Sequence, residues 1–579
     1  MQCELVSDVV VLADEYWEFF RDAAQLWNLD RGDVDQIERW EDFSPDAVAA
    51  RIARLGEFEH RAERLSAGVH DARDAALVSA VAFSARASAA MLHYDRDLSY
   101  VAGPFNLATL LSVYVPGYAL VTAEHGRGYI AKVKALPSFI DAWIAGVRDG
   151  VAAGRVATAR GIVGTADALH ALLSTDVNDD PLLTQPPPRE ASSHDADEWR
   201  NDVRDAVRDA ARPAMARFEQ FLRTELLPAA RTDDKPGVCH LPGGAEDYQQ
   251  CLLASTSMAL TPDAVHALGL ERLALLDDEY RRLGPSTVGI DDPAQVRERL
   301  RADRSLRYAS RDEIVHDAMA ALARAEAEAP RWFNRLPRAR CTGVAAESGA
   351  IAFYSGPSPD GVRGGTFFFN ASDPSTWSRY QLEVTTFHES VPGHHLHVAL
   401  AMELDLHPVV GELEVTSLGE GWGLYAERLA DEMDLYSSPL QRVGMLTLDS
   451  LRAARLVVDT GLHAMGWTRD SAIDVLRSHT ALDDRLVEAE IDRYIAFPGQ
   501  ATSYMVGRLE IQRLRRLAER RLGARFSIRE FHDVVLGSGM IPLPTLARTV
   551  DAWLDPSTTH QSAETLGARR ELDRRRDGR

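Results

Sequence analysis

The chain has 579 residues, 45% of them hydrophobic and 26% charged, which is typical of a globular protein long enough for several core-forming units. Its formal charge of −23, from 64 basic and 87 acidic residues, repels polyanions, so we expect no nucleic-acid partner and no membrane partner. The four cysteines, Cys3, Cys239, Cys251 and Cys341, lack C-x-x-C spacing, which argues against a disulfide framework or a cysteine-based zinc site.

The N-terminal segment MQCELVSDVVVLADEYWEFF lacks the basic start and the long apolar core of a signal peptide. No apolar segment precedes Cys3, as it would before a lipoprotein cleavage site. No apolar run approaches the roughly 18 residues expected of a membrane span. These features predict a cytoplasmic protein.

Most of the chain is predicted to be helical. Apolar residues recur at three- and four-residue spacing on a charged background in residues 14–27, 46–65 and 318–333. Ala, Leu, Arg and Glu dominate these segments and favour helix by intrinsic propensity. Residues 177–198, VNDDPLLTQPPPREASSHDADE, are polar and proline-rich and predict a long surface loop.

Two short strands are predicted within residues 347–374. Gly, Pro and Asp punctuate the segments IAFY (351–354) and TFFFN (366–370), a pattern typical of an antiparallel β-hairpin. We therefore divide one continuous domain into an N-terminal helical region (1–176), a polar loop (177–198), a central helical region (199–346), a catalytic region (347–560) and a charged tail (561–579).

The stretch FHESVPGHHLH, residues 387–397, begins as a zinc-binding H-E-x-x helix but has Pro392 where a second histidine is usual. His395 is seven residues after His388, about 10.5 Å along an ideal helix, which is too far for a shared ion. His394, at six residues, would point to another side of an undistorted helix. Pro392 and Gly393 could bulge the helix so that His394 becomes the second ligand, but spacing alone leaves His394 and His395 both open.

A third ligand is expected in the predicted helix 418–436, LGEGWGLYAERLADEMDLY. Glu420 lies at its start, and Glu427, seven residues later, is the competing candidate. Glu389, next to the first histidine, would be the general base that activates a water.

These motifs together resemble the DUF885 family. The resemblance rests on His388-Glu389-x-x-Pro-Gly-His394, on the Gly-Glu420-Gly-Trp segment, on AFYSGPSPDGVRGGTFFFN before the motif, and on VVDTGLHAMGW and EIDRYIAFPGQATSYMVGRLEI after it. It implies a large, mainly α, cleft-bearing fold similar to M32 carboxypeptidases and M3-type peptidases, with a small antiparallel hairpin beside the active-site helix.

The resemblance also implies roles for individual residues. His388, His394 and Glu420 would hold one Zn²⁺ per chain, with Mn²⁺ or Co²⁺ as possible substitutes, and Glu389 would be the base. His395 would then be a neighbour of the site.

Further candidates come from the matched segments. Tyr504 is the first choice and His463 the second to stabilise the oxyanion of a hydrolysis reaction. The expected substrate-binding residues are Arg508, Arg363, Phe368 and Tyr354. The TFFFN strand could present an edge to an extended peptide.

The sequence thus predicts a zinc-dependent hydrolase that cleaves an amide bond in a short peptide, with carboxypeptidase-like action suggested by the resemblance. Hydrolysis of a non-peptide amide or ester, and an inactive peptide-binding protein, are the alternatives. The expected partner is a small peptide or amide substrate, and the long helices could support a homodimer.

Overall fold

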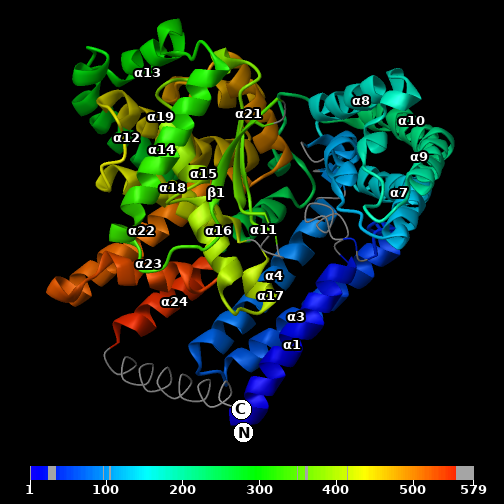
Figure 1. The fold of residues 1–579 in the computed structure, drawn as a ribbon, viewed down its shortest axis with the longest axis horizontal. Helices are drawn as coiled ribbons and strands as arrows, with labels where there is room; N and C mark the ends of the chain where they lie inside the picture. The colour runs from blue at the N-terminus through cyan, green and yellow to red at the C-terminus, as the bar shows by residue number, and fades with distance from the viewer. Residues whose placement is uncertain are drawn as a thin grey trace.

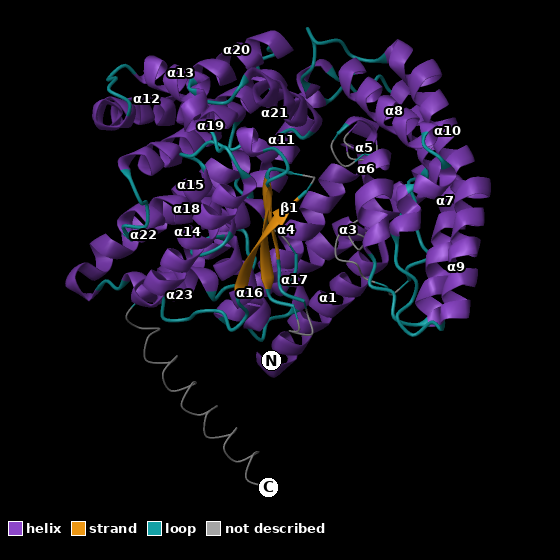
Figure 2. Ribbon diagram, turned by 45° about the horizontal axis from the view of Figure 1, so that its top comes forward, coloured by secondary structure: helices purple, strands orange, loops and turns teal. Residues whose placement is uncertain are grey.

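The computed structural model describes residues 2–23, 34, 36–94, 97–98, 100–103, 106–347, 350–358, 363–413 and 415–555. Helices make up most of these residues and one small sheet accompanies them, which confirms the predicted mainly α fold (Figures 1 and 2). The predicted charged tail, 561–579, lies outside the described residues.

Before the sheet, which begins at Cys341, the described residues are mainly helical. These helices are α1 (Gln2–Ala23), α3 (Pro45–Ser66), α4 (Ala72–Tyr94), α5 (Tyr100–Ala102), α6 (Leu107–Thr109), α7 (Ala123–Ala152), α8 (Ala159–Ser174), α9 (Ser193–Ala206), α10 (Arg212–Phe221), α11 (Gly244–Thr256), α12 (Pro262–Thr287), α13 (Pro293–Ala302) and α14 (Arg311–Trp332).

Ten helices follow the sheet in the described residues up to 555. They are α15 (Leu382–Glu389), α16 (His394–Glu403), α17 (Pro408–Gly411), α18 (Thr416–Glu432), α19 (Pro439–His463), α20 (Arg469–His479), α21 (Asp484–Ala496), α22 (Ser503–Leu522), α23 (Ile528–Leu536) and α24 (Leu543–Leu554). In both views α7–α10 lie on one side of the molecule and α12, α14, α15 and α18 on the other, with the sheet between them (Figures 1 and 2).

Helix α3 illustrates how the sequence pattern produces these elements. The Ser44 side chain caps its N-terminus by accepting a hydrogen bond from the backbone of Ala47, and Pro45 occupies its first position. Its buried residues are Val48, Leu55, Phe58 and Ala62, whose spacing of seven, three and four places them on one face. This face packs on α1 and α4.

Buried apolar side chains of the described residues form three clusters. The largest unites α1, α3 and α4 with helices α12 to α24, so the N-terminal helices pack on the C-terminal half of the chain. A second cluster is built mainly from α7 to α11, and a third lies between α14 and the sheet.

The predicted surface loop at 177–198 is wrong in its extent. Residues Val177–Asp179 and Pro181–Thr184 form 3-10 turns, and α9 begins at Ser193. Gln185 is buried and exchanges two hydrogen bonds with the backbone of Tyr118, while the Tyr129 hydroxyl donates to the Leu182 carbonyl. The segment is therefore packed against α7 and the turn before it.

The sheet contains the two predicted strands and one more. Strands β2 (Ala352–Ser355) and β3 (Gly365–Asn370) pair antiparallel, with Tyr354 opposite Phe367, which confirms the hairpin. Strand β1 (Cys341–Ala346) was not predicted and pairs parallel with β3, so the sheet is mixed and its order is β1-β3-β2. The predicted edge strand TFFFN is thus the central strand, and β2 is an edge.

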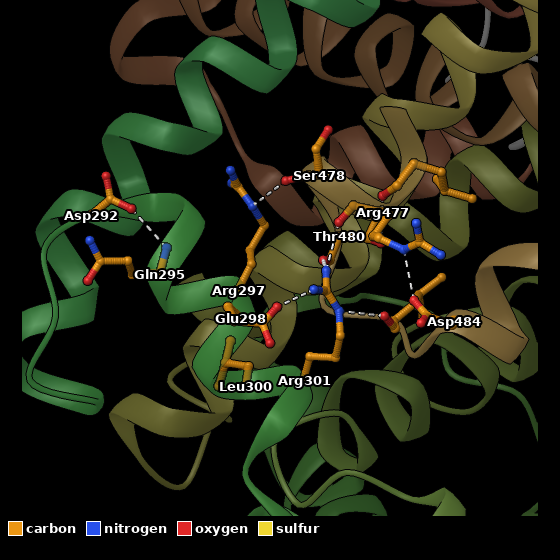
Figure 3. Close-up of polar contacts among 12 residues, drawn as sticks. Asp292, Gln295, Arg297, Glu298, Leu300, Arg301, Arg477, Ser478, Thr480 and Asp484 are labelled. Carbon is orange, nitrogen blue, oxygen red and sulfur yellow. Dashed lines mark hydrogen bonds and ion pairs between the residues drawn. The ribbon is translucent and has the colours of Figure 1, made fainter. Parts of the chain in front are cut away.

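Two arginines join α13 to the end of α20 (Figure 3). Arg297 donates to the Ser478 carbonyl, and Arg301 donates to the carbonyls of Arg477, Thr480 and Leu482. The last carbonyls of a helix have no partner within the helix, so these guanidinium groups satisfy them and lie at the negative end of its dipole.

Helix α4 contradicts the expectation that no apolar segment of the chain is long enough for a membrane span. Residues Ala72–Leu92 are long and apolar enough to cross a membrane by length and composition, and 33% of the apolar window is buried inside the protein.

Candidate metal centre

A cavity of about 670 Å³ lies where β2 meets the helices of the C-terminal half. It is lined by Phe353 and Tyr354 from β2, His388 and Glu389 from α15, His394 and His397 from α16, Glu420 from α18, Arg452 and Arg455 from α19, and Tyr504 from α22. Val398, Ala401, Met402, Leu404 and Leu406 add an apolar wall.

The H-E-x-x-P-G-H segment interrupts its helix. Helix α15 ends at Glu389, a cis peptide bond joins Val391 to Pro392, and α16 begins at His394. The prediction of a bulge within one helix is therefore wrong in detail, because two separate helices meet here. A Cβ atom on Gly393 would lie 1.9 Å from the His388 carbonyl oxygen, so only glycine allows this close approach.

The break brings His388 and His394 together. Their ring centroids are 4.6 Å apart and their planes are nearly perpendicular, at 88°. Glu420 Oε2 lies 3.4 Å from Nε2 of each histidine. The ligand atoms of all three residues lie within 4.8 Å of one another, which makes them a possible metal site.

The chemistry of these atoms fits a bound cation. Glu420 Oε2 is buried and makes no hydrogen bond to any described residue, although two imidazole nitrogens are near it. Two imidazoles and one carboxylate are the ligand set of catalytic zinc sites, which keep a further position open. A divalent metal held by His388, His394 and Glu420 would satisfy this oxygen.

Glu427, the alternative metal ligand, contacts the same centre from outside the cavity. Its buried carboxylate lies 2.8 Å from Nδ1 of His388, and its backbone carbonyl accepts a hydrogen bond from Tyr436. A carboxylate at Nδ1 fixes the proton there and leaves Nε2 free to face the cavity.

Glycines of α18 allow this helix to pack closely. A Cβ atom on Gly423 would lie 2.7 Å from the His388 ring, and one on Gly421 would lie 2.6 Å from Gly507 of α22. Trp422, between them in sequence, donates from its indole to the Pro392 carbonyl. Helix α18 therefore carries Glu420 and also supports the turn between α15 and α16.

The predicted base and the predicted oxyanion donor both line the cavity. Burial raises the pKa of Glu389, and the neighbouring His388 and His394 oppose that shift. Burial, followed by the negative charge of Glu420, raises the pKa of Tyr504 to about 12, so its hydroxyl keeps its proton near neutral pH. The cavity thus brings a carboxyl and a phenol beside the three ligand atoms.

Two predicted histidines lie elsewhere. His395 is buried between Tyr354, whose hydroxyl is 3.0 Å from Nδ1, and the Ala339 carbonyl, 3.1 Å from Nε2. His463, the second choice for the oxyanion donor, has both ring nitrogens bonded to the backbone, at Val238 and Tyr494. It does not line the cavity, and that prediction is corrected.

Two predicted substrate-binding arginines also fail to reach the cavity. Arg508 is buried and forms an ion pair with Asp449, which explains its presence inside the protein without any ligand. Arg363 is exposed, and its guanidinium is 3.4 Å from the Ser355 hydroxyl. Neither residue is part of the cavity lining.

The two predicted aromatic residues are placed differently from each other. Tyr354 lines the cavity. Phe368 stacks on Phe353, with ring centroids 4.8 Å apart, and supports a lining residue without lining the cavity itself.

Among the lining residues that escaped the sequence analysis are Arg452, Arg455 and His397. The arginines are three residues apart in the otherwise apolar segment LRAARLVV, and two cations on one face of a buried helix are a signal that could have been noticed. His397 lies in the quoted histidine cluster, and neither ring nitrogen has a hydrogen-bond partner among the described residues.

Comparison with protein families matches residues 26–550 to the family described as "Bacterial protein of unknown function (DUF885)". The chain belongs to the DUF885 family. No curated protein matches it.

Solved structures similar to this DUF885 protein have the same fold. A "putative lipoprotein" from Colwellia psychrerythraea is 24% identical with a TM-score of 0.85, covering 95% of this chain and 99% of its own. A "putative lipoprotein of unknown function" from Shewanella oneidensis is 15% identical with a TM-score of 0.74, covering 94% and 99%. Pyrococcus furiosus carboxypeptidase, at 11% identity and 95% and 99% coverage, has a TM-score of 0.37, too low to support a conclusion.

The predicted cytoplasmic location is contradicted by these neighbours. These two neighbours, which share the fold, are each described as a "putative lipoprotein", which points away from a cytoplasmic location. The cytoplasmic assignment is therefore withdrawn.

Proposed function

We propose that this DUF885 protein is a zinc-dependent hydrolase that cleaves an amide bond in a short peptide. The observation that carries the proposal is the convergence of His388, His394 and Glu420 within 4.8 Å in a cavity that also exposes Glu389 and Tyr504. A metal-only structural site would not need an adjacent carboxyl and phenol in an open cavity.

The bound metal would supply Lewis acidity, which lowers the pKa of water and polarises a carbonyl. Glu389, beside the ligand cluster, would accept the proton of the attacking water and then donate it to the departing amide nitrogen. The Tyr504 hydroxyl, protonated at neutral pH, would donate a hydrogen bond to the oxyanion as it forms.

The cavity and the edge strand suit an extended peptide. Strand β2 is at the edge of the sheet and lines the cavity through Ala352, Phe353 and Tyr354. A peptide could pair with the backbone of β2, which supplies affinity without reading side chains. The apolar wall formed by α16 and the residues that follow it would accommodate an apolar side chain of the substrate.

The test is Glu389→Gln in the full chain. This change keeps the shape of the side chain but removes its basicity, so we expect hydrolysis of short peptides to fall by at least about 10²-fold while bound zinc per chain stays the same. The measurements are peptide turnover by chromatography and metal content by emission spectrometry.

The matched control is Glu432→Gln, at the end of α18, whose carboxylate is paired with Arg515 on the surface. Near wild-type turnover by Glu389→Gln would contradict the proposed mechanism.

A further inference from the structure

A row of apolar side chains crosses the sheet on the face turned away from α14. Val344 of β1 lies opposite Phe368 of β3, and Phe368 lies opposite Phe353 of β2, so the three side chains share one face. Phe367 and Phe369 point to the other face, where they join the apolar cluster with α14. The rings of Phe353 and Phe368 stack with their centroids 4.8 Å apart.

This row is exposed although it is apolar. The exposed fraction is 39% for Val344, 43% for Phe353 and 50% for Ile351, which precedes Phe353 by two residues and shares its face. Apolar side chains that gather in one exposed patch, unlike single ones, mark a surface where another molecule binds. The row ends at the cavity, because Phe353 is also one of the lining residues.

The free edge of β2 runs along the cavity. Ala352, Phe353 and Tyr354 all line it, although successive side chains of a strand point to opposite faces, so the cavity lies beside the edge of the sheet. The Asn370 N–H donates to the Ile351 carbonyl, so every second residue from Ile351 turns its backbone groups toward β3. The backbone groups of Ala352 and Tyr354 therefore point to the free edge, where no described residue forms a hydrogen bond with them.

This geometry determines which side chain of an added peptide strand would meet the row. Residues directly opposite each other in neighbouring strands place their side chains on the same face of a sheet. A peptide that pairs with the backbone of Ala352 and Tyr354 thus places the residue opposite Phe353 beside the Phe353–Phe368 stack. An aromatic or large aliphatic side chain there would extend the apolar row, whereas a charged one would lose water against an apolar surface.

We propose that Phe353 and Phe368 form a specificity subsite for one aromatic or large aliphatic side chain of a peptide paired with β2. This rests on the proposed hydrolase function. The subsite is separate from the apolar wall that α16 contributes to the cavity, and it selects one position of the peptide, because backbone pairing alone selects none.

The test measures peptide binding by calorimetry to the zinc-loaded full chain with Glu389→Gln, which prevents turnover. The probes are pentaalanine and the five peptides in which one alanine is replaced by phenylalanine. We expect at least one of the five to bind at least tenfold more tightly than pentaalanine. Phe353→Thr, which keeps a strand-forming residue but removes the ring, should abolish that advantage, and Phe353→Leu should retain part of it.

Leu275→Ala is the matched control, because Leu275 is an apolar residue of α12 with a similar exposed fraction, 45%, and does not line the cavity. It should leave the preference for phenylalanine intact. Equal affinity for all six peptides, including no binding of any, would overturn the proposal. An equal loss for pentaalanine and the phenylalanine peptides in Phe353→Thr would also overturn it.

Met402→Ala tests whether the phenylalanine binds to the wall of α16 instead. A preference that Met402→Ala removes and Phe353→Thr leaves intact belongs to that wall and would overturn the subsite.

Turnover by the zinc-loaded wild-type chain separates this inference from the function on which it rests. A higher kcat/KM for the preferred phenylalanine peptide than for pentaalanine supports both. The same kcat/KM for all six peptides overturns the subsite and leaves the hydrolase intact. Cleavage of none contradicts the hydrolase, while the binding experiment still decides whether Phe353 recognises an apolar side chain.

Discussion

The contact between His388 and Glu427 fixes which ring nitrogen of His388 faces the cavity. Replacing Glu427 by Gln keeps an oxygen near Nδ1 but removes the negative charge that makes the imidazole a better donor. We expect zinc affinity to fall by roughly 10- to 100-fold, as is typical of partners of metal-binding histidines. Competition with a chelating indicator measures it.

Glu432→Gln serves again as the control, because Glu432 lies on α18 but pairs with Arg515 at the surface. An unchanged zinc affinity in Glu427→Gln would mean that the carboxylate behind His388 has no influence on the site.

The burial of His463 should make the folded protein less stable in acid. Burial lowers its pKa from 6.5 to about 3, so below pH 6.5 the unfolded chain takes up a proton that the folded chain does not. Stability is therefore lost as the pH falls. Between pH 7.5 and pH 5 this residue alone should reduce the free energy of unfolding by about 2 kcal/mol.

His463→Gln should lower the melting temperature at pH 7.5 but make it less sensitive to pH, since no group at this position titrates. Scanning fluorimetry across pH 5 to 7.5 measures the slope. His170→Gln, which replaces an exposed histidine, should leave the slope unchanged. An equally steep slope in His463→Gln would show that the buried ring is not responsible.

At the scale of elements, the attachment of α13 to α20 depends on Arg301. Arg301→Ala removes the donors to three backbone carbonyls. Because these carbonyls would stay partly buried without a partner, the free energy of unfolding should fall by roughly 2 kcal/mol. We expect a lower melting temperature and faster hydrogen exchange in α13. Arg299→Ala is the control, because Arg299 is on the same helix and mostly exposed. Identical exchange in the two variants would contradict this role.

The sequence predicted elements well where the determining pattern is local. Helix α3 and helix α14 follow from apolar periodicity, and the β2–β3 hairpin follows from two strands and the turn residues between them. Strand β1 was missed because CTGVAA has little alternation and pairs in parallel with a strand more than twenty residues away. The loop prediction at 177–198 failed because Gln185 is ordered by Tyr118, far from it in sequence.

The site residues, too, could be predicted where a local motif contains them and not where their contacts are distant in the chain. His388, His394 and Glu420 were found because short motifs contain them, although the helix break between the histidines was predicted as a bulge. The role of Arg508 could not be predicted, because its partner Asp449 is 59 residues away in the chain. Arg452 became notable only when the fold placed it in the cavity beside Tyr504.

At the scale of the whole molecule, the candidate metal centre joins several parts of the C-terminal half. Its three ligands come from α15, α16 and α18, and the cavity around it is completed by β2, α19 and α22. The N-terminal helices α1, α3 and α4 pack on this half through the largest apolar cluster (Figure 1). The position of the centre thus depends on packing across most of the chain.

The most direct measurement is the zinc content per chain of the wild type, His394→Ala and His395→Ala, each purified without added metal. His394 lies 3.4 Å from Glu420 Oε2, whereas His395 is bonded to Tyr354 and the Ala339 carbonyl. The predicted result is about one zinc in the wild type and in His395→Ala, and none in His394→Ala. Zinc retained by His394→Ala, or absent from the wild type even after zinc is supplied, would contradict the metal centre.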